Sequence, residues 1–142
     1  MIVPSIRFTA GWKYMTDAPA SYMLSERWVN VPSFALREGM VHGPSRTLTI
    51  EEEYPWDGAS GPTIDTKDSM VPSLIHDFLY EAFRQGKLDP HEWREKADLE
   101  FYDLCLACGM GKIRASTWFY AIRWGAAKAA RPESNHAVLE AP

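Results

Sequence analysis

The side chains best suited to chemistry lie in the segment HDFLY, residues 76–80, and at Asp98. His76 and Tyr80 are four residues apart, so on a helix they share one face. A second, antiparallel helix could bring Asp98 to both of them. A carboxylate that accepts the N–H of one imidazole nitrogen fixes the tautomer and leaves the other nitrogen as a base. His76, Tyr80 and Asp98 therefore form a candidate catalytic site that could activate water.

Asp77 lies one residue further round the same helix, where its carboxylate is free to bind a cation. Calcium takes six to eight oxygen ligands, and backbone carbonyls of an irregular loop often supply some of them. The loop WDGASG, residues 56–61, comes shortly before the helix and could fold back over its start. Calcium is therefore the one cofactor that this pattern suggests.

A purely structural interpretation of the same residues stays open beside the catalytic one. A buried histidine paired with a buried aspartate across two helices is a common structural device, because buried polar groups must find partners. In that case Asp77 would hold the preceding loop in place, and the network would serve stability alone.

The elements that position these residues predict an α+β protein. Residues 1–54 are rich in β-branched and aromatic residues with prolines and glycines between them, which is typical of an antiparallel β portion. Residues 55–68 contain two prolines and two glycines and are expected to form a loop. Three helices are expected to follow, and their predicted ranges are 72–85, 90–107 and 113–130. The short connection after the first helix makes the first two antiparallel neighbours.

Helix signals are clearest around the second helix. Asp89 followed by Pro90 is an N-cap with a first-turn proline, and Gly109 marks the end. Pro72 is expected to occupy the first turn of the helix before it, where proline is tolerated. The only cysteines, Cys105 and Cys108, lie near the C-terminal end of the second helix. A redox pair needs a helix N-terminus, so we expect two small core residues instead.

Composition limits the architecture and the partners. A chain of 142 residues with 46% hydrophobic residues supports one globular domain, expected at residues 1–131 with a C-terminal tail at 132–142. The helical portion of that domain is expected at residues 69–131. The net charge of −4 gives no electrostatic footprint for nucleic acid. Neither a transmembrane segment nor a secretory signal is expected.

Three blocks of the sequence resemble a bacteriophage and prophage protein family of unknown function. They are YPWDGASGPTID at 54–65, LIHDFLY at 74–80, and REKADLEF at 94–101 with CGM at 108–110. The resemblance spans about residues 46–126. It implies a phage-encoded protein located in the virion or in the cytoplasm of the infected bacterium. Other virion proteins would then be its partners.

The helical blocks also resemble, more weakly, phospholipase A2, especially the minimal form in parvovirus capsids. That resemblance implies that His76 is the general base, that Asp98 orients it and that Tyr80 braces Asp98. It further implies that Asp77 ligates calcium. Carbonyls around Trp56, Gly58 and Ser60 would complete the shell. The phospholipase loop spaces its glycines two apart, whereas Gly58 and Gly61 are three apart.

Two functions follow as expectations. The first is a structural or accessory protein of the phage tail, baseplate or head, in which the histidine–aspartate network holds helices and loop together. The second is a calcium-dependent, phospholipase A2-like lipid or ester hydrolase that acts in phage entry or host lysis and contacts lipid.

Overall fold

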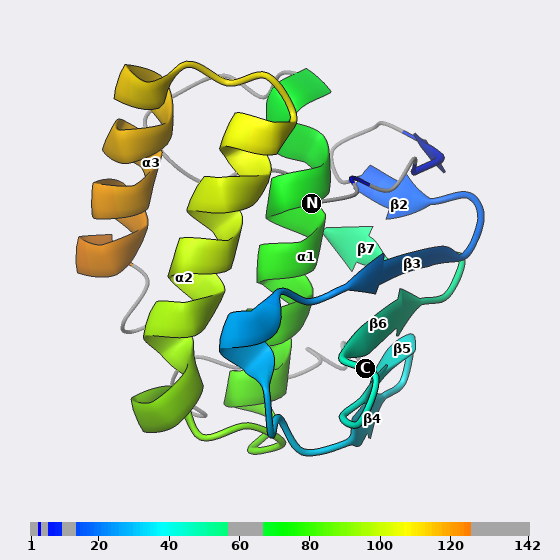
Figure 1. Cartoon of the computed structure of the whole chain (residues 1–142). Helices are drawn as coiled ribbons and strands as arrows, with labels where there is room; N and C mark the ends of the chain where they lie inside the picture. The colour runs from blue at the N-terminus through cyan, green and yellow to red at the C-terminus, as the bar shows by residue number, and fades with distance from the viewer. Residues whose placement is uncertain (1–2, 4–5, 10–13, 57–66, 126–142) are drawn as a thin grey trace, which may run out of the picture.

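The computed structural model describes residues 3, 6–9, 14–56 and 67–125 of the chain. Three helices stand side by side, with α2 between α1 and α3, and the strands lie beyond α1 (Figure 1). The expected α+β class is confirmed, because antiparallel strands occupy the N-terminal part and three helices follow. The expected tail, residues 132–142, lies outside the described residues.

The strands form two small antiparallel sheets. Their bounds are β1 Phe8–Thr9, β2 Tyr14–Thr16, β3 Ala20–Met23, β4 Phe34–Leu36, β5 Gly39–His42, β6 Thr47–Ile50 and β7 Pro55–Trp56. The larger sheet has the order β3-β6-β5-β4, and the smaller one has the order β1-β2-β7. A short 3-10 helix, Glu26–Trp28, follows β3 in a region expected to be strand.

Buried and exposed residues alternate along the strands of the larger sheet, so one of its faces is buried. In β3 and β5 every second residue is buried, as expected where one face packs on a core and the other faces solvent. Tyr22, Leu48 and Val41 are opposite one another on three neighbouring strands, and all are buried. This row packs in the same core as Phe78 of α1.

The glycines of residues 1–54 were expected to lie between strands. Gly39 is instead the first residue of β5 and pairs with Ile50. A Cβ atom at Gly39 would lie 2.5 Å from the carbonyl oxygen of Thr49 and 2.6 Å from the ring of Phe78. Glycine is therefore required here because α1 packs closely against the sheet.

Helix α1 spans Lys67–Arg84, so it begins before the predicted range. Pro72 lies inside the helix, and the expectation that it occupies the first turn is wrong. An interior proline lacks the N–H that would bond to the carbonyl of residue 68, and its ring crowds that carbonyl, so Pro72 weakens the helical ladder at this point while its side chain is buried. The predicted loop 55–68 is also too long at both ends. Pro55–Trp56 is strand β7, and residues 67 and 68 are helical.

Helix α2 spans Pro90–Ala107, as its sequence signals predicted. The Asp89 side chain accepts a hydrogen bond from the backbone N–H of His91 at 3.0 Å. Gly109 has a φ of +98°, the left-handed conformation that commonly ends a helix. Helix α3 spans Lys112–Gly125, and the predicted continuation to residue 130 lies outside the described residues.

The hydrophobic core has two parts that meet at α2. The larger part joins the sheet, α1 and one face of α2, and the smaller part joins α2 and α3 around Phe101, Trp118 and Ile122. Cys105 is fully buried in the smaller part, Cys108 is half-buried, and both are free thiols. Two core layers on opposite faces of α2 explain why polar residues of α2 are also buried.

Glu100 is one such residue, and it joins α2 to the β portion. It is fully buried and accepts hydrogen bonds from Tyr22 at 3.3 Å and from the backbone and side chain of Ser25 at 3.1 and 2.9 Å. Arg27 lies 3.5 Å from the same carboxylate and 2.6 Å from Asp103. Glu100 is therefore a structural carboxylate whose partners are more than 70 residues away along the chain.

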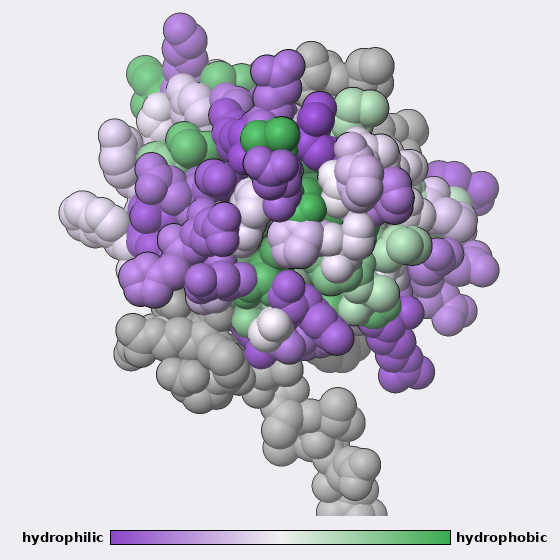
Figure 2. Space-filling model, turned by 60° about the horizontal axis from the view of Figure 1, so that its bottom comes forward, coloured by the Kyte–Doolittle hydropathy of each residue, from purple (hydrophilic) through white to green (hydrophobic). Residues whose placement is uncertain are grey.

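The surface turned to the viewer in Figure 2 is mostly hydrophilic, with hydrophobic side chains in smaller areas between the polar ones. None of the helices in the described part of the chain has the length and apolar character needed to cross a membrane.

Candidate functional site

Asp98 is the centre of the candidate site. It lies on α2 with 0% of its surface exposed. Its Oδ1 atom accepts a hydrogen bond from Nε2 of His76 at 2.8 Å and one from the hydroxyl of Tyr80 at 2.7 Å. The structure therefore brings together the three residues named as catalytic from the sequence. The spacing of four along α1 and the antiparallel packing of α2 are the reasons why they meet.

Two arginines complete the surroundings of Asp98, and neither was expected from the sequence. Arg123 of α3 donates a hydrogen bond from Nη1 to Oδ2 of Asp98 at 2.7 Å. Nη1 of Arg94 lies 3.7 Å from the same oxygen, and within the described part of the chain that nitrogen has no hydrogen-bond partner. The contact of Arg94 with Asp98 could have been predicted from the sequence, because Arg94 precedes Asp98 by one helical turn. Arg123 could not, because its contact depends on how α3 packs.

These partners keep Asp98 ionised. Burial alone would raise the pKa of Asp98, because it disfavours the charge. The hydrogen bond and charge of His76 oppose that effect, and the hydrogen bonds from Tyr80 and Arg123 act in the same direction as His76. The pKa of Asp98 is consequently lowered from its ordinary value. An ionised Asp98 accepts a hydrogen bond from the N–H at Nε2 of His76, which leaves the other ring nitrogen unprotonated in the neutral imidazole.

His76 is held rigidly and still reaches the surface. Its ring centroid lies 4.2 Å from that of Tyr80 and 5.2 Å from that of Phe101. The side chain is 13% exposed, and no hydrogen bond to Nδ1 is found among the described residues. A general base requires a fixed ring with one nitrogen left for the substrate proton, and the described contacts of this partly exposed ring agree with that requirement.

Asp77 is half-buried and points to a different partner. The hydroxyl of Tyr54 donates a hydrogen bond to its Oδ2 at 3.2 Å. Burial raises the pKa of Asp77 above its ordinary value. The charge of Arg84 and the hydrogen bond from Tyr54 act in the opposite direction without overcoming burial, and the charge of Glu81 raises the pKa further. Asp77 is thus a carboxyl group whose charge is poorly compensated.

The expected calcium loop is only partly described. Trp56 is buried, and its indole N–H donates a hydrogen bond to Oγ of Ser73 at 3.1 Å. This side chain anchors the end of β7 to α1, a role that its sequence context did not indicate. Gly58 and Ser60, the other expected contributors, lie outside the described residues. Over the ranges that the structure describes, no group of three or more His, Cys, Asp or Glu residues could hold a metal ion.

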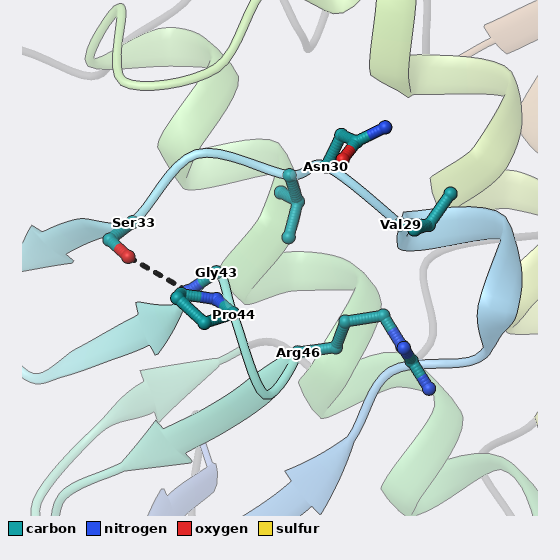
Figure 3. Close-up of a pocket in the computed structure, with 7 residues that line it drawn as sticks. Val29, Asn30, Ser33, Gly43, Pro44 and Arg46 are labelled. Atoms are coloured by element: carbon teal, nitrogen blue, oxygen red, sulfur yellow. Dashed lines mark hydrogen bonds between the residues drawn. The ribbon is translucent and has the colours of Figure 1, made fainter.

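A pocket of about 310 Å³ lies beside the 3-10 helix, between the segment before β4 and the turn that joins β5 to β6 (Figure 3). On its wall, the hydroxyl of Ser33 accepts a hydrogen bond from the backbone N–H of Gly43 at 2.8 Å. The lining residues are Val29, Asn30, Val31, Ser33, Gly43, Pro44 and Arg46. None of the residues named from the sequence as catalytic or metal-binding lines this pocket.

Comparison with known proteins does not assign this chain to a family. The chain matches no protein-family model, no curated protein and no solved structure. The function must therefore be argued from the site itself.

Proposed function

We propose that this protein is a lipid or ester hydrolase in which His76, oriented by Asp98, activates water. The observation that carries the proposal is the hydrogen bond between Nε2 of His76 and Oδ1 of Asp98, at 2.8 Å, on a partly exposed ring whose Nδ1 has no partner among the described residues. A histidine in this state can take a proton from water near neutral pH.

The reaction follows from that arrangement. Nδ1 of His76 removes a proton from a water molecule, whose oxygen attacks the carbonyl carbon of the ester. Asp98 stabilises the imidazolium that forms, and Tyr80 and Arg123 hold Asp98 in place. The imidazolium then returns the proton to the leaving alcohol oxygen as the carbon–oxygen bond breaks. The products are a carboxylic acid and an alcohol, and His76 is restored.

Calcium is part of this proposal, with Asp77 as its carboxylate ligand. A half-buried carboxylate with a raised pKa gains from a nearby cation, so the chemistry of Asp77 fits such a ligand. Backbone carbonyls at Trp56, Gly58 and Ser60 would supply further oxygens. When bound, calcium would polarise the ester carbonyl and stabilise the oxyanion.

The test is hydrolysis by purified protein of phospholipid vesicles and of a soluble short-chain ester, with calcium and with a chelator. We expect turnover that requires calcium and is lost in His76→Ala. His91→Ala is the matched control, because His91 is exposed and uses only its backbone N–H at the helix cap. Absence of turnover by the unmodified protein on both substrates would overturn the hydrolase.

The second candidate is a structural or accessory protein of a phage virion, and one observation favours it. A single buried carboxylate, Asp98, receives hydrogen bonds from α1 and α3 while it belongs to α2. Such a junction can serve stability alone. In this candidate the protein associates with other virion proteins, and the His76→Ala variant loses only stability. Detection of the tagged chain in purified phage particles, without any ester turnover, would support it.

A further inference from the structure

The outer face of α3 carries an apolar stripe that the catalytic proposal does not use. Ile113, Tyr120 and Trp124 are 87%, 61% and 88% exposed, and Thr117 between them is also exposed. Their spacing of four, three and four residues places them on one side of the helix. We call these four residues the α3 outer stripe.

The opposite side of α3 packs against α2 and forms the hydrophobic contact of this helix with the core. Ala115, Trp118 and Ile122 are buried against α2. In Figure 1, α3 is the outermost of the three helices, with α2 between it and α1. The α3 outer stripe is therefore not required for the core, and its large apolar side chains face away from the rest of the described fold.

The stripe ends at the residue that follows Arg123 in the chain. Trp124 directly follows Arg123, whose guanidinium bonds to Asp98, the partner of His76. A surface bound at the Trp124 end of the stripe therefore lies at the same end of α3 as Arg123 but on its outer side, whereas His76 belongs to α1, on the other side of α2 (Figure 1).

The charge of α3 indicates the type of surface that fits. The helix contains Lys112, Arg114 and Arg123 and no acidic residue, although the whole chain has a net charge of −4. Arg114 and Arg123 bond to Asp68 and Asp98, while Lys112 is exposed at the start of the stripe. Tryptophan and tyrosine have an apolar ring with a polar tip, which suits the boundary between headgroups and acyl chains. Lysine adds attraction to anionic headgroups.

A second copy of the chain fits the stripe less well. A helix of 14 residues is about 21 Å long and about 10 Å wide. One face of it offers on the order of 200 Å², whereas a stable interface buries about 800 Å² on each partner. A bilayer surface needs no such matching area, because a few side chains inserted at the interface are enough for reversible binding.

We propose that the α3 outer stripe docks the protein on an anionic phospholipid bilayer, so that phospholipid in a membrane is the substrate class. The choice of substrate rests on the proposed hydrolase, whereas bilayer binding does not. Ile113 and Trp124 insert at the interface and hold the protein on the surface that contains its ester substrate.

Co-sedimentation with vesicles of phosphatidylcholine and phosphatidylglycerol tests the binding. We expect the unmodified protein and His76→Ala to sediment equally, and the double variant Ile113→Ser/Trp124→Ser to bind at least about tenfold more weakly. The matched control is Met23→Ser/Val29→Ser, which removes two exposed apolar side chains from the β portion and should bind normally. All variants are first checked for an unchanged Tm.

Three results would overturn the inference. They are no sedimentation of the unmodified protein, equal sedimentation of the Ile113→Ser/Trp124→Ser variant, and a dimer in solution that this variant dissociates. Turnover separates the two proposals. The stripe variant should lose activity on vesicles and keep it on a soluble short-chain ester. Normal vesicle binding with no turnover of either ester would contradict the proposed hydrolase and still support the docking surface.

Discussion

Arg123 of α3 bonds to the carboxylate oxygen of Asp98 that His76 leaves unused, at a distance of 2.7 Å. The two oxygens of one buried side chain thus divide their partners between two helices. Oδ1 faces α1, Oδ2 faces α3, and the carboxylate itself belongs to α2. The same side chain that orients His76 therefore also fixes the third helix, so function and stability are coupled at this residue.

The first prediction concerns Arg123. Arg123→Met removes one partner of a buried charge, and we expect the free energy of unfolding to fall by roughly 2 kcal/mol. His76, Tyr80 and Arg94 stay near Asp98, which keeps the loss below that of an isolated buried charge. Urea unfolding measures it.

Arg37→Met is the control for this change. Arg37 is exposed and lies 3.7 Å from Glu38, so we expect a loss of at most about 0.5 kcal/mol. Equal effects of the two substitutions would show that the Arg123 contact is not formed in solution.

The second prediction compares two buried carboxylates on α2. Asp98→Asn and Glu100→Gln each leave the partners of a carboxylate facing a neutral amide, and we expect each to lower the free energy of unfolding by about 2 kcal/mol. Only Asp98→Asn should lower ester turnover, on the order of 10²-fold, because it can no longer stabilise the imidazolium. Thermal unfolding and turnover by the folded protein are the measurements. A similar loss of turnover in both variants would mean that Asp98 acts only through stability.

The third prediction concerns pH. Asp77 has a raised pKa in the folded protein, so the folded state holds its proton at pH values where the unfolded state has already lost it. Stability from this group is complete below the ordinary value of 3.8 and falls as the pH rises through the folded pKa. Asp77→Asn keeps an acceptor for Tyr54 without the charge, and it should raise the free energy of unfolding at neutral pH.

Asp98 behaves in the opposite direction, because its folded pKa is lowered. Its contribution is present above the ordinary value of 3.8 and is lost as the pH falls through the folded pKa. Urea unfolding between about pH 2 and about pH 8 measures this contribution. The free energy of unfolding should fall less at acidic pH in Asp98→Asn than in the unmodified protein. An unchanged pH dependence in both aspartate variants would contradict the burial of Asp77 and the hydrogen bonds to Asp98 that the structure shows.

The fourth prediction concerns Gly39. Gly39→Ala places a Cβ atom 2.5 Å from the carbonyl oxygen of Thr49, so either the strand or α1 must move. We expect a loss of roughly 2 kcal/mol in the free energy of unfolding. Gly125→Ala is the control, because a Cβ atom there would have no described neighbour within 4 Å, and its effect should stay within about 0.5 kcal/mol. Equal thermal stability of the two variants would contradict the close packing of α1 on β5.

Local signals explain the parts of the fold that could be predicted. Asp89 and Pro90 define the start of α2, and a spacing of four on α1 places His76 beside Tyr80. These relationships need only short stretches of sequence. The meeting with Asp98 also followed, because a short connection forces neighbouring helices to pack antiparallel.

The parts that could not be predicted depend on long-range packing. Gly39 looks like a loop glycine until Phe78, 39 positions later, is known to leave no room for a side chain. Arg123 and Glu100 find their partners through the placement of α3 and of the β portion, and no local spacing indicates either contact. The start of α1 was missed for a different reason, because Pro72 suggested a helix start although the helix already includes Lys67.

The two buried carboxylates also suggest an order of folding events. The partners of Asp98 on α1 are 18 and 22 residues away, whereas the partners of Glu100 on the β portion are 73 to 78 residues away. Short loops close at a lower entropic cost, so the α1–α2 hairpin should form before the β portion docks on it. Asp98 contacts would then be present in the folding transition state, and Glu100 contacts would form late and chiefly control the rate of unfolding.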